Sequence, residues 1–218
     1  MSNSLSLHHI TRPSNTITNE TPVLFMFHGY GSNEEDLFSF ASELPEDIFV
    51  ISVQAPYQLP PYGYAWYAIE FDANGAKWSD DNQARASRDL MANFITEACE
   101  YYNLTKDNVT LLGFSQGTIL SYAVALSYPE KVKNVIALSG YINKDILQED
   151  YQSLDHKNLN FYVSHGTVDQ VLPIEWARDS KKVLDALNIN YVFEEYPVGH
   201  GVAPQNFYSF KNWLANKI

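Results

Sequence analysis

The 218-residue sequence holds a single cysteine, Cys99, so no disulfide can form within the chain and nothing indicates an oxidising compartment. Basic residues are scarce as well, because 14 lysines and arginines stand against 26 aspartates and glutamates, for a formal net charge of −12. A field of that sign repels nucleic acids and anionic lipid surfaces, and it disfavours anionic substrates. We therefore expect a neutral small-molecule substrate and no nucleic-acid partner.

Long hydrophobic runs and metal-binding patterns are also missing. No apolar stretch approaches the length of a transmembrane helix, so we expect no stable membrane insertion. The N-terminus lacks the basic region and the sustained apolar core of a secretory signal, and cytoplasmic residence is the default prediction. The histidines are scattered, without His-x-x-x-His or cysteine-rich spacing, so we predict no metal site and no cofactor.

A Gly-x-Ser-x-Gly pentapeptide occupies residues 113–117. An apolar run at Val109–Leu112 precedes it, and residues 118–126 follow with a helix-like pattern. A serine on such a sharp turn from strand to helix exposes its hydroxyl above the edge of the sheet. The flanking glycines remove the crowding that a β-carbon would cause there. The pattern predicts that Ser115 is a nucleophile.

A serine hydroxyl needs a base, and the base needs an acid that orients it. In this type of site the partners follow the serine in the order acid, then histidine. Asp169 lies just past the expected strand Phe161–Ser164, and His200 lies between two glycines past the expected strand Tyr191–Tyr196. Because parallel sheets gather ligand groups at the carboxyl ends of their strands, we predict that Ser115, Asp169 and His200 form a catalytic triad.

An oxyanion hole is the fourth part of such a site. The apolar run Val23–Phe27 ends in His28-Gly29-Tyr30-Gly31, a short variant of a His-Gly-Gly-Gly loop. We predict that the backbone N–H groups of Tyr30 and Gln116 stabilise the oxyanion. Ser32-Asn33-Glu34-Glu35 resembles a capping box and predicts a helix directly after this loop.

Three side chains near these motifs admit a second interpretation. His165 is a rival base, but Asp169 is too close in sequence to orient it easily, so His200 is preferred. His28 begins the oxyanion loop, and we expect it to bind backbone and fix that loop. The amide of Gln116 could bind substrate, although backbone donation alone is the simpler interpretation.

Four motifs together resemble one known family. Residues 28–33, 113–117, 166–173 and 199–201 resemble the phospholipase/carboxylesterase family, which includes small bacterial carboxylesterases and acyl-protein thioesterases. The resemblance runs from about residue 22 to residue 213. It implies a compact α/β-hydrolase that lacks a large cap domain and hydrolyses carboxylic esters or thioesters. It also implies the triad and oxyanion roles given above. Relatives often carry leucine in place of Tyr30, so the tyrosine could alter the rim of the pocket.

Expected strands and helices alternate along the whole chain. This order predicts a mostly parallel sheet with helices on both faces, in a single domain over residues 1–218. The expected strands are Leu5–Ile10, Val23–Phe27, Phe49–Val53, Val109–Leu112, Val135–Ser139, Phe161–Ser164 and Tyr191–Tyr196. The expected helices begin near Asn33, Asn82, Gln116, Pro173 and Pro204, with Pro173 inside the first turn. An apolar helix face could support a homodimer, although no patch defines one.

The segment 54–78 is irregular and rich in aromatic residues. It predicts either a lid or wall that shapes an apolar pocket beside Ser115, or a hairpin whose aromatic side chains pack against the domain. We name Trp66, Tyr67 and Leu172 as candidate substrate-binding residues. Trp66 is preferred because relatives carry a tryptophan in this region.

The sequence leads to one main hypothesis about function. The chain is expected to be a serine carboxylesterase that hydrolyses neutral carboxylic esters through an acyl-enzyme on Ser115. An acyl-thioesterase or a lysophospholipase with the same triad is the alternative, because each presents the same acyl carbon. A ligand-binding protein of the same fold is a further alternative, but a pure binder has no use for an activated serine.

Overall fold

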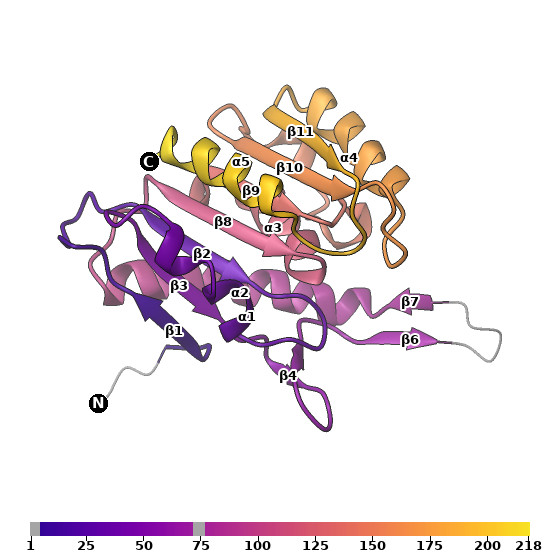
Figure 1. Ribbon diagram of the computed structural model, residues 1–218, viewed down its shortest axis with the longest axis horizontal. Coiled ribbons are helices and arrows are strands. Elements are labelled where there is room, and N and C mark those ends of the chain that lie inside the picture. Colours follow the sequence, from indigo (N-terminus) through magenta and orange to yellow (C-terminus); the bar gives the residue numbers. More distant parts are fainter. Residues whose placement is uncertain (1–4, 72–76) are drawn as a thin grey trace.

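The computed structural model describes residues 5–71 and 77–218, and its centre is a seven-stranded sheet (Figure 1). The strand order is β1-β3-β2-β8-β9-β10-β11. β1 pairs antiparallel with β3, and the other neighbours are parallel. The strands are β1 His9–Arg12, β2 Val23–Phe27, β3 Phe49–Val53, β8 Val109–Phe114, β9 Asn134–Leu138, β10 Asn160–Gly166 and β11 Asn190–Tyr196.

Helices cover both faces of this sheet (Figure 1). One buried apolar cluster joins one face to α2, α3 and α4, and a second joins the opposite face to α1 and α5. The helices are α1 Glu35–Phe38, α2 Asp81–Tyr101, α3 Gln116–Ser127, α4 Ile174–Ala186 and α5 Pro204–Ala215. Short 3₁₀ helices lie at Ala41–Glu43, Pro129–Lys131, Lys144–Ile146 and Tyr151–Ser153.

The second strand shows why its sequence is apolar without interruption. All five residues of β2 are buried. Val23, Phe25 and Phe27 belong to the cluster under α2 and α3, whereas Leu24 and Met26 belong to the cluster under α1 and α5. A strand that is buried on both faces needs apolar side chains at every position. The predicted α/β-hydrolase fold, with a mostly parallel sheet and no large cap, is confirmed.

The first strand differs from the prediction. We expected Leu5–Ile10, but β1 is His9–Arg12, and Leu7 is buried just outside it. β1 lies at the sheet edge, and His9 pairs with Val53 of β3. The antiparallel partner therefore fixes the start of β1, while Leu7 still contributes to the apolar core.

Two helix starts also differ from the prediction. The capping box does not form, because Ser32 Oγ donates to Asp36 Oδ2 at 2.7 Å and the N–H of Glu35 donates to Asn33 Oδ1 at 2.9 Å. α1 begins at Glu35 and has four residues. Pro173 is the residue that precedes α4 and not a member of its first turn, since its extended ψ of 136° is not helical.

The aromatic segment 54–78 contains two small antiparallel hairpins. One joins β4 Tyr57–Gln58 to β5 Tyr64–Ala65, and the other joins β6 Ile69–Phe71 to β7 Lys77–Ser79. The second hairpin projects away from the sheet (Figure 1). Residues 72–76 of this segment lie outside the described residues. The prediction of a single domain covers the whole chain and stays a prediction.

Candidate active site

The pentapeptide forms a tight turn between β8 and α3. Ser115 precedes the helix with φ 53° and ψ −116°, a backbone conformation that non-glycine residues rarely adopt. Its N–H donates to Leu138 O at 3.0 Å, and Thr118 Oγ1 donates to the same carbonyl at 2.7 Å. The end of β9 thus anchors both sides of the turn. The serine hydroxyl is held at the carboxyl end of the sheet.

The two motif glycines are required by close backbone contacts. A β-carbon on Gly117 would lie 2.0 Å from the carbonyl oxygen of Phe27, and one on Gly113 would lie 2.6 Å from the backbone of Gly117. No side chain fits at such distances, and the neighbours are backbone atoms of β2 and α3 that cannot rotate away. Gly117 therefore lets the turn at Ser115 approach β2, and Gly113 lets the end of β8 approach the first turn of α3.

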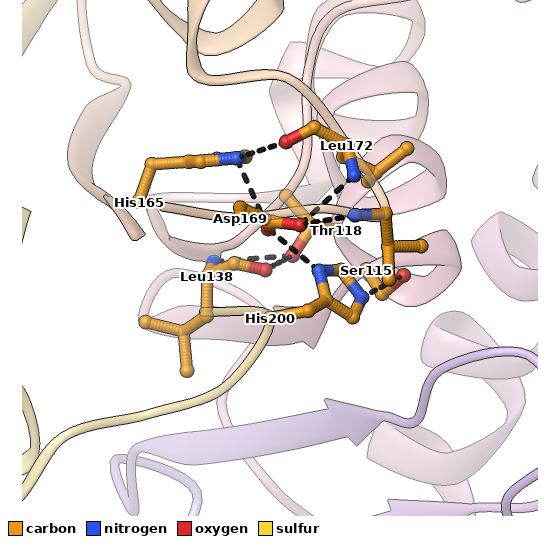
Figure 2. Close-up of polar contacts among 8 residues, drawn as sticks. Ser115, Thr118, Leu138, His165, Asp169, Leu172 and His200 are labelled. Carbon is orange, nitrogen blue, oxygen red and sulfur yellow. Dashed lines mark hydrogen bonds and ion pairs between the residues drawn. The ribbon is translucent and has the colours of Figure 1, made fainter. Parts of the chain in front are cut away.

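Ser115, His200 and Asp169 form a continuous chain of hydrogen bonds (Figure 2). Ser115 Oγ lies 2.9 Å from His200 Nε2, and His200 Nδ1 lies 2.7 Å from Asp169 Oδ2. The Asp169 carboxylate can only accept a hydrogen bond, so His200 Nδ1 carries the proton. His200 Nε2 is then free to accept a hydrogen bond from the Ser115 hydroxyl. The three predicted side chains come from loops after β8, β10 and β11.

Asp169 is held in its ionised form. Burial by itself would raise the pKa of this carboxyl group, but hydrogen bonds from His200 and from the N–H groups of Leu172 and Val171 outweigh it and leave the pKa below its ordinary value. The two backbone donors lie 2.9 and 2.8 Å from Oδ1. The other oxygen, Oδ2, faces His200. A buried carboxylate is thereby aimed at the imidazole.

The loop after β2 passes directly over the nucleophile turn. A β-carbon on Gly29 would lie 3.4 Å from Cβ of Ser115 and 3.2 Å from the Phe114 ring. Tyr30 follows in this loop, and Gln116 is the first residue of α3, so its N–H has no partner within the helix. Tyr30 and Gln116 both line the same cavity as Ser115. The structure therefore brings the two predicted oxyanion residues to the cavity beside Ser115.

His28 fixes this loop, as we expected. Its Nδ1 lies 2.7 Å from Gly29 O, and its Nε2 accepts the N–H of Ala55 at 3.0 Å. Trp66 Nε1 donates to His28 O at 2.9 Å. Burial lowers the pKa of His28 in spite of the bond to Gly29, which keeps the ring neutral and its Nε2 available as an acceptor.

The side chain of Gln116 has a role that the sequence did not indicate. Oε1 accepts the N–H of Trp66, and Nε2 donates to Tyr67 O, each at 2.8 Å. Gln116 and Trp66 are buried. The amide is therefore occupied within the chain, where it ties the aromatic segment to the first turn of α3. Only its place directly after Ser115 could have drawn attention to it.

Trp66 does not occupy the position that we predicted. It is fully buried and packs against the rings of Phe27 and His28, at 5.5 and 5.6 Å between centroids. It is not among the residues that line the cavity, whereas Tyr67 and Leu172 are. Trp66 is held behind the loop after β2 because its backbone N–H donates to Gln116 and its indole N–H donates to His28 O.

A cavity of about 450 Å³ opens beside Ser115 and His200. Asp36 lines its rim, and no lysine or arginine does so among the described residues. Tyr30 is 43% exposed at this site, in keeping with an altered rim. The sequence did not single out Tyr141 or Trp176, which come from distant segments. The aromatic and aliphatic side chains of the lining are Tyr30, Tyr67, Ile69, Phe114, Ile119, Tyr141, Val171, Leu172 and Trp176.

His165, the rival candidate for the base, makes its contacts away from Ser115. His165 is 2% exposed, and its Nε2 lies 2.8 Å from Leu172 O and 3.3 Å from Asp169 Oδ2. His200 and not His165 reaches Ser115 Oγ (Figure 2).

Within residues 5–71 and 77–218, no group of three or more His, Cys, Asp or Glu side chains could hold a metal ion. None of the described helices is long and apolar enough to cross a membrane.

The strand order, the serine turn at the carboxyl edge and the acid and histidine that follow it in sequence define an α/β-hydrolase. The sequence profile of the phospholipase/carboxylesterase family matches residues 10–218, so the chain belongs to that family. The predicted resemblance is confirmed, and so is the predicted class of enzyme, an ester hydrolase.

Individual relatives agree with this membership. Acyl-protein thioesterase 1 of Kluyveromyces lactis is 32% identical over 124 residues, which are 56% of this chain and 53% of that protein. This chain thus spans about half the length of that relative. Acyl-protein thioesterase 1 of Emericella nidulans is 26% identical over 219 residues, with 91% of each chain covered. The crystal structure of a Bacillus cereus carboxylesterase superposes with a TM-score of 0.84 at 20% identity, over 100% of this chain and 97% of that one, and shows the shared fold.

Proposed function

We propose that this protein is a serine carboxylesterase that hydrolyses neutral carboxylic esters through an acyl-enzyme on Ser115. The observation that carries the proposal is the unbroken series of contacts from Asp169 through His200 to Ser115 Oγ, at 2.7 and 2.9 Å, which opens on an apolar cavity. Distances in this range let the imidazole take the serine proton as the new bond forms.

The first half of the reaction acylates the serine. His200 Nε2 accepts the Ser115 proton while Oγ attacks the acyl carbon, and the carbonyl electron pair moves onto the oxygen. The N–H groups of Tyr30 and Gln116 stabilise that oxyanion. Asp169 holds the imidazole by Nδ1 and stabilises its protonated form. When the tetrahedral intermediate collapses, the alkoxide leaves with the proton from His200 Nε2.

The second half releases the acid. Water gives a proton to His200 Nε2 and attacks the acyl carbon, and a second tetrahedral oxyanion forms at the same two N–H groups. Its collapse breaks the bond to Ser115 Oγ, which recovers the proton from His200. The carboxylic acid then leaves, and the starting hydrogen bonds re-form.

The lining of the cavity supports a neutral ester as the substrate. The cavity walls are mostly aromatic and aliphatic, and among the described residues they include the carboxylate of Asp36 but no lysine or arginine. An anionic substrate would find no counter-charge there, and the net charge of −12 adds to the repulsion. Cytoplasmic residence and a homodimer stay predictions from the sequence.

The test is hydrolysis of p-nitrophenyl esters of increasing acyl length by wild type and Ser115→Ala. We expect turnover by wild type that vanishes in the variant, with an optimum that reflects the cavity. A folded wild type without turnover over the whole series would contradict the proposal. A ligand that stabilises the protein thermally but is never hydrolysed would then favour the ligand-binding alternative.

A thioesterase is the second candidate function, because two relatives are named acyl-protein thioesterases. The triad and the oxyanion groups would act on a thioester in the same way, with a thiol in place of the alcohol. Matched oxygen and sulfur esters with one acyl group decide between them. A ratio of kcat/KM that favours the sulfur ester far beyond the ratio of their rates with hydroxide would assign the thioesterase. Lysophospholipids belong in the same comparison.

A further inference from the structure

Among the described residues, His165 is the one histidine that contacts Asp169 without reaching Ser115. It lies in β10, one residue before the strand ends at Gly166. Its side chain and that of Asp169 are both fully buried. Figure 2 shows its ring directed at Asp169 and at the carbonyl of Leu172. A buried polar side chain in this place is costly unless it makes hydrogen bonds.

The contacts of His165 determine which nitrogen carries the proton. A carbonyl oxygen only accepts, so Nε2, at 2.8 Å from Leu172 O, must be the donor. The same Nε2 also lies 3.3 Å from Asp169 Oδ2, so its N–H dipole stands next to the carboxylate although its hydrogen bond goes to Leu172 O. Nδ1 is buried and has no hydrogen-bond partner among the described residues. A second proton on Nδ1 would create a buried donor without an acceptor, so the ring is the neutral Nε2–H form.

Leu172 completes a closed arrangement around the carboxylate. Its N–H donates to Asp169 Oδ1 at 2.9 Å while its carbonyl accepts from His165. The loop that carries Asp169 is thereby closed onto the end of β10. The side chain of Leu172 also lines the cavity. One imidazole therefore touches both the acid and a wall of the substrate pocket.

We propose that His165 is a positioning residue, which fixes Asp169 through the Leu172 carbonyl and withdraws negative charge from the oxygen that faces His200. The inference rests on the proposed function, because it assigns a role within the same triad. Asp169 Oδ2 accepts Nδ1–H of His200 at 2.7 Å, and the N–H group of His165 Nε2 lies 3.3 Å from the same oxygen. Loss of that N–H dipole removes a partial positive charge beside the carboxylate that faces His200, and the protonated form of His200 is then favoured. As the pH is lowered, activity that needs neutral His200 would then be lost at a higher pH than in wild type.

Substitution of His165 leaves the other charged side chains near His165 and Asp169 unchanged. Glu195 of β11 lies beside His165 in register, and both its oxygens bind Arg178 of α4 at 2.8 Å. On the other side, β9 presents no ionisable residue among Val135–Leu138. The titratable group in contact with His165 Nε2 is Asp169, whose Oδ2 also binds His200. A change at position 165 thus alters the N–H group that binds Leu172 O and lies beside Asp169, and it leaves the charges of Glu195 and Arg178 unchanged.

The experiment compares wild type with His165→Phe, His165→Gln and His165→Asn. Phenylalanine keeps the ring without a donor. Glutamine places an N–H about where Nε2 lies, whereas asparagine is too short to reach it. NMR titration of the His200 ring, assigned with His200→Gln, gives its midpoint without any substrate. The acid limb of kcat/KM for a p-nitrophenyl ester gives the same quantity through activity.

We expect the midpoint of the His200 titration to rise by about half a pH unit in His165→Phe and His165→Asn. In His165→Gln it should stay close to the wild-type value. We expect kcat/KM to fall about 10- to 100-fold in Phe and Asn, because Asp169 is less well placed.

Equal midpoints in all folded variants would overturn the proposal, as would a loss of activity that glutamine does not rescue. If Phe does not fold, the Gln and Asn pair decides. Loss of about 10⁴-fold or more in the Phe variant would make His165 the base itself, which also overturns it. A wild type that hydrolyses no ester contradicts the proposed function instead, and the NMR midpoints still test His165.

Discussion

Replacement of Gln116 by methionine removes two buried hydrogen bonds and leaves the backbone N–H of residue 116 in place. Methionine has a similar length and packs well in irregular spaces. The lost bonds are those to the N–H of Trp66 and to the carbonyl of Tyr67, both 2.8 Å long. The exposed fractions of Trp66 and Tyr67 are 0% and 4%, so water does not replace the missing amide.

The size of the effect follows from the two groups that are left without a partner. Each unsatisfied buried donor or acceptor costs about 1–3 kcal/mol, so the free energy of unfolding should fall by about 2–6 kcal/mol. Tyr67 lines the cavity, and a small shift of this wall should also lower kcat/KM, by about tenfold or more. Urea unfolding and hydrolysis of a p-nitrophenyl ester series measure the two effects.

Ser121→Ala is the matched control on the same helix. Ser121 is buried, and its Oγ donates to Gly117 O at 2.7 Å. That carbonyl keeps its ordinary helical partner, so no group is left unsatisfied, and stability should change by less than about 1 kcal/mol. If Gln116→Met is as stable and as active as this control, the amide does not tie the aromatic segment to α3, and the reasoning fails.

Three further predictions concern the triad and the serine turn. Ser115→Ala and His200→Ala should each lose about 10⁴-fold or more in kcat while remaining folded, and near-normal turnover in either would refute their roles. Gly117→Ala places a β-carbon 2.0 Å from Phe27 O and should cost more than about 4 kcal/mol in urea unfolding; a stable, active variant would contradict the close approach. Because the pKa of Asp169 in the folded protein lies below its ordinary value, its contribution to stability is present above the unfolded-state pKa of about 3.9 and is lost as the pH falls through the folded value. Asp169→Asn should therefore flatten the dependence of unfolding free energy on pH in that acid range, and an unchanged acid slope would count against it.

The sequence predicted the parts of the fold that local patterns determine. Val23–Phe27 is apolar at each position because β2 is buried on both faces, and its bounds were predicted without error. Ser115, Asp169 and His200 could be placed together because each follows the end of a strand, and parallel strands end at one edge. The catalytic roles of these residues stay proposals, which the variants above test.

Contacts between distant segments could not be predicted in this way. Trp66 lies 50 residues from Gln116, and no periodicity indicates that the backbone N–H of one binds the amide of the other. β1 was placed too early because an edge strand takes its register from its partner, and the pairing of His9 with Val53 leaves no trace in the local sequence. The position of His165 Nε2 beside both Leu172 O and Asp169 is likewise visible only once β10 and its loop are folded.

The charge of the cavity has a consequence for what happens after catalysis. Under the proposed function, a neutral ester enters a pocket whose described lining includes Asp36 and no lysine or arginine, and hydrolysis converts it into an acid that ionises at neutral pH. The new carboxylate has no cation to hold it there, and a chain with a net charge of −12 repels it. The same surface that tolerates the uncharged substrate thus expels the charged product. Inhibition by the released acid should be weak, and ester hydrolysis should proceed with little retention of product.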